Sequence, residues 1–109
     1  MGKKVLYLTK GTMALVKLFA IGKKTGGEVV RDAVLDLIEG GKGVVIDYVG
    51  GEKLALRVDD YTHYLVNRLK VEMDYEVVDE LVFDAMVNYC VGRGIPVECV
   101  EHILEAVGE

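Results

Sequence analysis

A helix with clear signals at both ends is the feature that constrains the fold most. Thr25 is followed three residues later by Glu28, a spacing in which each side chain accepts a hydrogen bond from the other residue's backbone N–H. Apolar residues then recur at helical spacing, and Gly40–Gly41 stands where a helix commonly ends in a left-handed residue. The sequence therefore predicts a helix over about residues 26–39.

Apolar segments of strand-like composition lie on both sides of this helix. Each pair of segments is separated by a glycine-containing turn, Lys10–Gly11 in one case and Gly50–Gly51 in the other, and glycine supplies the positive φ that a tight hairpin turn requires. In the second pair, residues 53–58 alternate apolar with polar side chains, as a strand with one buried face does, although they also fit a connector. We therefore expect two β-hairpins, with strands at residues 4–9, 13–21, 44–49 and 53–58.

Helical patterns fill the rest of the chain. They cover about residues 59–70, residues 76–91 and a last segment from Pro96 onward, and residues 71–75 fit either a short strand or a turn. The middle pattern has an apolar stripe broad enough to be covered on more than one side. We predict a single α+β domain over residues 1–109, with a small sheet from two β-hairpins around one helix and with C-terminal helices (ββαββ-ααα).

Charge is distributed unevenly along the chain. Residues 1–24 contain six lysines and no acidic residue, the remainder contains seven basic and eighteen acidic residues, and the net charge is −5. Because affinity for a polyanion comes mostly from positive charge, this balance makes nucleic acid a second-choice partner. The absence of Ser, Gln and Trp favours a thermophilic source. No apolar run approaches the roughly 18 residues of a membrane span, so we expect a cytoplasmic protein with no membrane partner.

The loop Gly22–Gly27 has the order of elements that an anion site requires. A predicted strand precedes it and a helix N-terminus follows, where backbone N–H groups and the positive end of the helix dipole attract negative charge. It is not a P-loop, because both lysines precede the final glycines. A plain capped loop is the favoured interpretation. The alternative is an anion site formed by Lys23, Lys24, Thr25, Gly26 and Gly27.

Two further groups of residues are candidate sites. Lysines on the first predicted hairpin would form a nucleic-acid patch only if they converge on one face. An aspartate pair and a histidine, three and four residues apart, would share one helix face and could contribute to a metal site. The favoured interpretation of this second group is a helix cap beside a surface histidine. The candidate residues are Lys3, Lys4, Lys10 and Lys17 for the patch, and Asp59, Asp60 and His63 for the metal site.

Catalysis has little support in the sequence. The absence of Ser removes every serine nucleophile. Cys90 and Cys99 are interpreted as buried, reduced thiols, since a reactive cysteine needs a nearby base and an electropositive setting. A metal site that joins them to His102 matches no zinc spacing. We therefore expect no enzyme activity and no cofactor.

A resemblance to a known family covers about residues 22–70. The sequence GEVVR, the sequence VVIDYVGG and the following Asp60 resemble the motifs of STAS-like domains, the group related to anti-sigma-factor antagonists. The resemblance implies an α/β sandwich, an alternative to the fold above, and a non-catalytic docking role, often with a regulatory kinase-like ATP-binding protein. It would assign functional positions to Asp47, Gly50 and Asp60. No hydroxyl residue occupies the position of the family's phosphorylation switch, within residues 57–60.

The sequence therefore favours a non-catalytic regulatory or protein-interaction module. Apolar residues make up 51% of the chain and form broad stripes on the last helices, so we expect a covering partner, most simply a second copy in a homodimer. The alternative is binding of nucleic acid or a phosphate ligand through the N-terminal lysines and the loop Gly22–Gly27.

Overall fold

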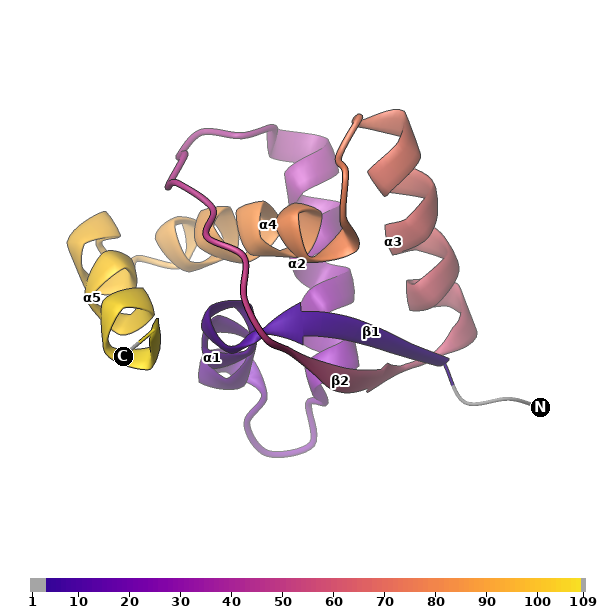
Figure 1. Cartoon of the computed structure of the whole chain (residues 1–109), viewed down its shortest axis with the longest axis horizontal. Coiled ribbons are helices and arrows are strands. Elements are labelled where there is room, and N and C mark those ends of the chain that lie inside the picture. Colours follow the sequence, from indigo (N-terminus) through magenta and orange to yellow (C-terminus); the bar gives the residue numbers. More distant parts are fainter. Residues whose placement is uncertain (1–3, 109) are drawn as a thin grey trace.

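The structure, a computed structural model, describes residues 4–108. It has the α+β composition expected from the sequence, with helices in the majority, and α5 and α3 lie at opposite ends of the molecule (Figure 1). The elements in chain order are β1 (Lys4–Thr9), α1 (Lys10–Phe19), α2 (Gly26–Gly40), β2 (Lys53–Val58), α3 (Asp60–Glu72), α4 (Val78–Gly92) and α5 (Val97–Gly108).

The sheet consists of β1 and β2 in antiparallel register. Lys4 lies opposite Val58 at one end, and Thr9 lies opposite Lys53 at the other. The two strands come from different predicted hairpins, with α1 and α2 between them in the chain, so neither hairpin forms. The predicted ββαββ-ααα order is therefore wrong within the described residues, which form two strands rather than four.

The first hairpin fails because residues 10–19 form a helix. Thr12, Leu15 and Val16 are buried on one face of α1, at the spacing of a helix rather than of a strand. Lys10 and Gly11, predicted as a turn, are the first residues of this helix. Gly11 has a packing role instead, because a Cβ there would lie 3.0 Å from the side chain of Leu104 on α5.

The second hairpin fails because residues 41–52 have no regular secondary structure. The Asn88 side chain on α4 takes the role of a strand partner. Its carbonyl oxygen accepts hydrogen bonds from the backbone N–H groups of Gly43 and Val44 at 2.9 Å, and its amide donates to the Val44 carbonyl at the same distance. The β-branched residues of this segment therefore lie in an extended strap held by α4.

The helices after residue 25 agree with the sequence. The predicted capping box opens α2, with Thr25 and Glu28 bonded in both directions, and Gly41 follows the helix with a φ of 70°. Asp59 caps α3, and residues 73–77 form the connection to α4. The broad apolar stripe of α4 is covered within the chain, since this helix packs against α1, α2, α3 and β1.

Two strand–helix–helix units make up most of the fold. One is β1–α1–α2, the other is β2–α3–α4, and each unit's second helix packs against the other unit's strand. The first helix of each unit also packs against the second helix of the other unit, α1 against α4 and α3 against α2. Leu6 lies opposite Leu56, and α1 and α3 each begin four residues after these leucines, so an approximate two-fold axis that relates the two units passes between them. The core lies between this ribbon and the crossed pair α2 and α4.

Candidate nucleic-acid interface

The two faces of the β1–β2 ribbon differ in chemistry. Leu6, Leu8 and Val58 point inward and are buried in the core. The outward face is exposed, and the Tyr7 side chain is 59% accessible to solvent. Lys4, Lys53 and Arg57 are the only charged residues of the two strands, so the ribbon contains no carboxylate. The outward positions are Val5 and Tyr7 on β1, and Lys53, Ala55 and Arg57 on β2.

The positive charges of the ribbon are available to a ligand. Within residues 4–108, Lys53 and Arg57 form no ion pair, in contrast to Arg31 on α2, which lies near three carboxylates. Both side chains belong to exposed residues. A ligand would therefore not have to displace an internal partner to reach them.

The start of α2 lies against β2. A Cβ added at Gly27 would be 3.2 Å from the Arg57 carbonyl oxygen and 3.3 Å from the Val58 Cα, so this glycine permits the close approach of helix and strand. The same packing brings the loop that precedes α2 beside the end of the ribbon that contains Lys4 and Arg57. Sequence reasoning identified that loop but not its neighbour.

The predicted anion site is partly used by the helix itself. Thr25 accepts from the Glu28 N–H at 3.2 Å, and the Thr25 N–H donates to the Glu28 carboxylate at 3.0 Å, which lowers the pKa of Glu28. Lys24 pairs with Asp32 at 2.5 Å, and this hydrogen bond raises the lysine pKa. Lys23 is exposed. The structure therefore places Lys23 through Gly27 together as a capped loop with one lysine outside any ion pair.

The predicted lysine patch does not converge. Lys4 is the first residue of β1, whereas Lys10 follows its last residue as the first residue of α1, about 20 Å away at the rise of a strand. Lys17 is exposed near the end of α1. Lys3 lies outside the described residues. Of the predicted lysines within the described residues, only Lys4 belongs to the ribbon; Lys53 and Arg57, the other basic residues of the ribbon, were missed by sequence reasoning. In the sequence, Lys53 and Arg57 alternate with Leu54 and Leu56, which indicates that the basic residues share the outer face of a strand. This pattern identifies a candidate binding site only once the partner strand is known.

At the other end of the ribbon, a buried carboxylate joins β1 to α4. Asp79 is 1% exposed, and it accepts from the Thr9 N–H at 2.8 Å and from the Thr9 hydroxyl at 3.0 Å. The Tyr48 hydroxyl donates to it at 2.5 Å, and burial together with this bond raises the tyrosine pKa. The Thr9 N–H, the Thr9 hydroxyl and the Tyr48 hydroxyl thus all donate to the Asp79 carboxylate, which satisfies these polar groups. Through Tyr48, the carboxylate also connects the strap to the end of β1. No signal in the sequence distinguishes this buried acid from the solvent-exposed ones.

A second polar cluster holds the beginning of the strap. Asp84, nearly buried on α4, accepts from the Tyr75 hydroxyl at 2.6 Å and lies 3.4 Å from the Lys42 Nζ. Burial, followed by the bond to Asp84, raises the pKa of Tyr75. These contacts, with those of Asn88, give an irregular segment a defined position.

The predicted metal ligands are used differently. The Asp59 side chain caps α3 by accepting from the Thr62 N–H at 2.7 Å, and this bond lowers the pKa of Asp59. Asp60 is the first residue of the helix, and His63 lines a surface hollow that Tyr7 and Lys53 of the ribbon also line. Across residues 4–108, no three His, Cys, Asp or Glu side chains are grouped so that they could hold a metal ion.

The two cysteines differ in exposure. Cys90 is buried in α4, and burial raises the pKa of its thiol to about 11. Cys99 on α5 is exposed, so the prediction that both thiols are buried is wrong for this residue. Its position on the outer side of the last helix explains the difference, since Val100 is the residue that α5 buries.

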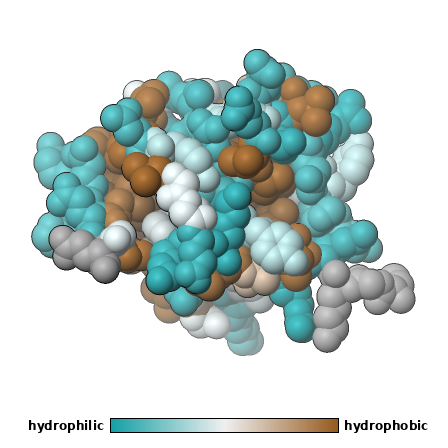
Figure 2. Space-filling view, in the orientation of Figure 1, coloured by the Kyte–Doolittle hydropathy of each residue, from teal (hydrophilic) through white to brown (hydrophobic). Residues whose placement is uncertain are grey.

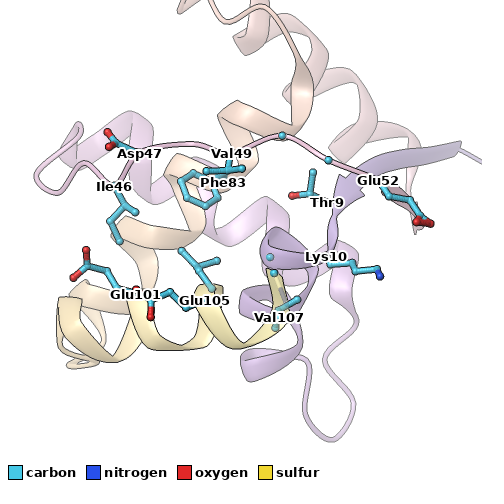
Figure 3. A pocket seen from close by; sticks show the side chains of 15 residues that line it. Thr9, Lys10, Ile46, Asp47, Val49, Glu52, Phe83, Glu101, Glu105 and Val107 are labelled. Atoms are coloured by element: carbon cyan, nitrogen blue, oxygen red, sulfur yellow. The ribbon is translucent and has the colours of Figure 1, made fainter.

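A groove of about 740 Å³ separates the strap from α5 (Figure 3). Ile46 and Phe83 line it, whereas the side chains of Lys10 and Glu52 point away from its centre. Apolar residues reach the surface on this side of the molecule (Figure 2). Carboxylates surround the apolar lining, contributed by Asp47, Glu52, Glu101 and Glu105.

The residues singled out by the STAS-like motifs do not form one site. Asp47 and Gly50 lie in the irregular strap, and Asp60 opens α3. No helix in residues 4–108 combines the length and the apolar character needed to cross a membrane. Comparison with protein-family models, with curated proteins and with solved structures finds no match to this chain.

Proposed function

We propose that the protein binds duplex DNA by inserting the outward face of the β1–β2 ribbon into the major groove. The observation that carries the proposal is an exposed antiparallel ribbon without carboxylates, on which Tyr7, Lys53 and Arg57 are solvent-accessible. A two-stranded ribbon is one of the two protein elements that the major groove admits, and known β-ribbon readers bind in this way.

The dimensions of the ribbon suit the groove. Its strands lie about 4.8 Å apart, so the pair with its side chains fits a groove about 12 Å wide. Each strand has 6 residues. At about 3.3 Å per residue the ribbon is about 20 Å long, the length of about six base pairs. The outward side chains in the middle of the ribbon then face base edges.

Neighbouring elements supply contacts to the DNA backbone. The loop before α2 lies beside β2, and Lys23 there can neutralise a phosphate while the first N–H groups of α2 face the same anion. The net charge of −5 opposes binding to a polyanion, and Glu76 lines a hollow beside Tyr7 and Lys53. The two strands themselves contain no acidic residue, so the charge that favours DNA is local to the ribbon.

The test uses two arginine variants with the same loss of charge. A DNA sequence is first selected from random duplexes with the wild-type protein, and its affinity is then measured by fluorescence anisotropy. Arg57→Ala removes an outward ribbon side chain, and we expect affinity to fall about 5- to 150-fold, the loss of one base contact. Arg93→Ala is the control, since Arg93 lies at the far end of α4, about 20 Å from β1 along the helix axis.

We expect Arg93→Ala to bind within about two-fold of wild type, as a surface charge outside the contact does. Circular dichroism of both variants checks that they are folded. Equal affinities for all three proteins, or no selected sequence at all, would remove the proposal.

A second candidate function is a protein-interaction module. The groove between the strap and α5, with its partly apolar lining, favours it, together with exposed Val45 and Val49 on the strap. We propose a second copy of the chain as the occupant, in agreement with the homodimer expected from composition. Light scattering at micromolar concentration should then give twice the chain mass of 12.0 kDa, and a single-chain mass would exclude this occupant.

A further inference from the structure

We propose that one copy of the chain reads a non-palindromic DNA sequence, with different base preferences in the two halves of the ribbon. The inference rests on the proposed DNA binding. Two identical chains that form a ribbon must present the same side chains to both halves of a site. Here both strands belong to one chain, and residues related by the approximate two-fold axis differ.

The outward residues on either side of the axis have different chemistry. Tyr7 follows Leu6 in β1, and Arg57 follows Leu56 in β2, so the tyrosine and the arginine occupy equivalent positions. Arginine donates two hydrogen bonds to the O6 and N7 atoms of guanine. Tyrosine offers one hydroxyl and an apolar ring edge, which suits a thymine methyl group or a single acceptor. One half of the ribbon therefore specifies guanine and the other half does not.

The elements that flank the ribbon also differ. Beside β2, α2 begins with a capped glycine pair preceded by Lys23 and Lys24. Beside β1, the equivalent helix α4 has Val77 at its N-cap without a side-chain hydrogen bond, and its first turn carries Asp79 and Glu80. The first turn of α2 carries a single acidic residue, Glu28, so a phosphate is attracted more strongly at this end than at the start of α4. Contacts to the DNA phosphates thus favour one orientation of the ribbon on the duplex, in addition to the preference set by the base contacts.

The test uses a variant that makes the two equivalent outward positions of the ribbon identical. Tyr7→Arg places an arginine at both equivalent positions. Ile38→Arg is the control, because it adds the same charge to an exposed position near the end of α2, far from β2. Wild type and both variants are used separately to select binding sequences from one pool of random duplexes, and the sequences recovered are aligned.

We expect wild type and Ile38→Arg to recover the same motif without dyad symmetry, with guanine specified on one side. Tyr7→Arg should recover a motif in which the guanine preference appears in both halves, related by a dyad. A palindromic wild-type motif, or a Tyr7→Arg motif identical to that of wild type, would overturn the inference while leaving DNA binding intact. Failure of wild type to enrich any sequence would instead refute the proposed function, and this inference with it.

Discussion

The contact between α2 and the ribbon makes a sharp prediction about Gly27. Replacement by alanine adds a Cβ that lies 3.2 Å from the Arg57 carbonyl oxygen and 3.3 Å from both the Cα and the Cγ1 of Val58. Two of these three atoms belong to the backbone of β2, which is held in register with β1 and cannot rotate away as a side chain could. The strand or the helix must therefore shift by a few tenths of an ångström.

The expected loss of stability follows from two opposing effects. Alanine favours a helix over glycine by up to about 1 kcal/mol. Forcing a methyl group into a packed contact costs about 1 to 3 kcal/mol. The strain exceeds the helix preference, so we expect Gly27→Ala to lower the free energy of unfolding by about 1 to 2 kcal/mol.

Gly40→Ala is the matched control. Gly40 is the last residue of the same helix, its φ is not positive, and a Cβ there would meet no atom within 4 Å. This variant should gain about 0.5 to 1 kcal/mol. The two variants should then differ by about 2 kcal/mol, which corresponds to a difference of about 10 °C in Tm for a chain of this size. Urea and thermal unfolding followed by circular dichroism measure both quantities. If Gly27→Ala is as stable as Gly40→Ala, the described contact between helix and strand is incorrect.

The remaining predictions concern the strap, the thiols and the salt dependence of binding. Tyr48→Phe should lower stability by about 1 to 2 kcal/mol because it removes a donor to a buried carboxylate, whereas Tyr7→Phe at an exposed site should change it by less than about 0.5 kcal/mol; equal unfolding midpoints would contradict this. At pH 8 a thiol reagent should modify Cys99 rapidly and Cys90 only on unfolding, because a buried thiol with a pKa of about 11 is almost fully protonated there; mass spectrometry that shows two fast modifications would refute the assignment. Lys23→Ala should reduce the slope of log affinity against log salt concentration by about 1, and an unchanged slope would exclude the phosphate contact.

Local sequence signals located most helices but not the pairing of the strands. The capping box of Thr25 and Glu28 and the glycines after residue 39 fixed α2, because both ends of that helix are determined by neighbouring residues. Residues 4–9 and 53–58 are strands as predicted, yet each was assigned a local partner. Their true pairing depends on how α1, α2 and the strap fold between them, which no short segment specifies.

Two segments were misassigned because distant contacts decide their conformation. Residues 13–19 contain strand-forming Val and Phe, but their buried positions follow the helical period once α4 and α5 cover them. Residues 44–49 have the composition of a strand, yet they form no regular secondary structure, and the Asn88 side chain bonds the backbone of Val44 at their start. The candidate interface was missed for the same reason, since Lys53 and Arg57 form a face only together with β1. A thermophilic source and a cytoplasmic location stay predictions from composition.

The central claim is that the outward face of the ribbon contacts duplex DNA. Titration of isotope-labelled protein with a selected duplex, followed by two-dimensional NMR, tests it residue by residue. We predict the largest shifts of amide signals at Tyr7, Ala55 and Arg57, with smaller ones over residues 23–27. Shifts confined to α5 and residues 41–52, with the ribbon signals unchanged, would contradict the account.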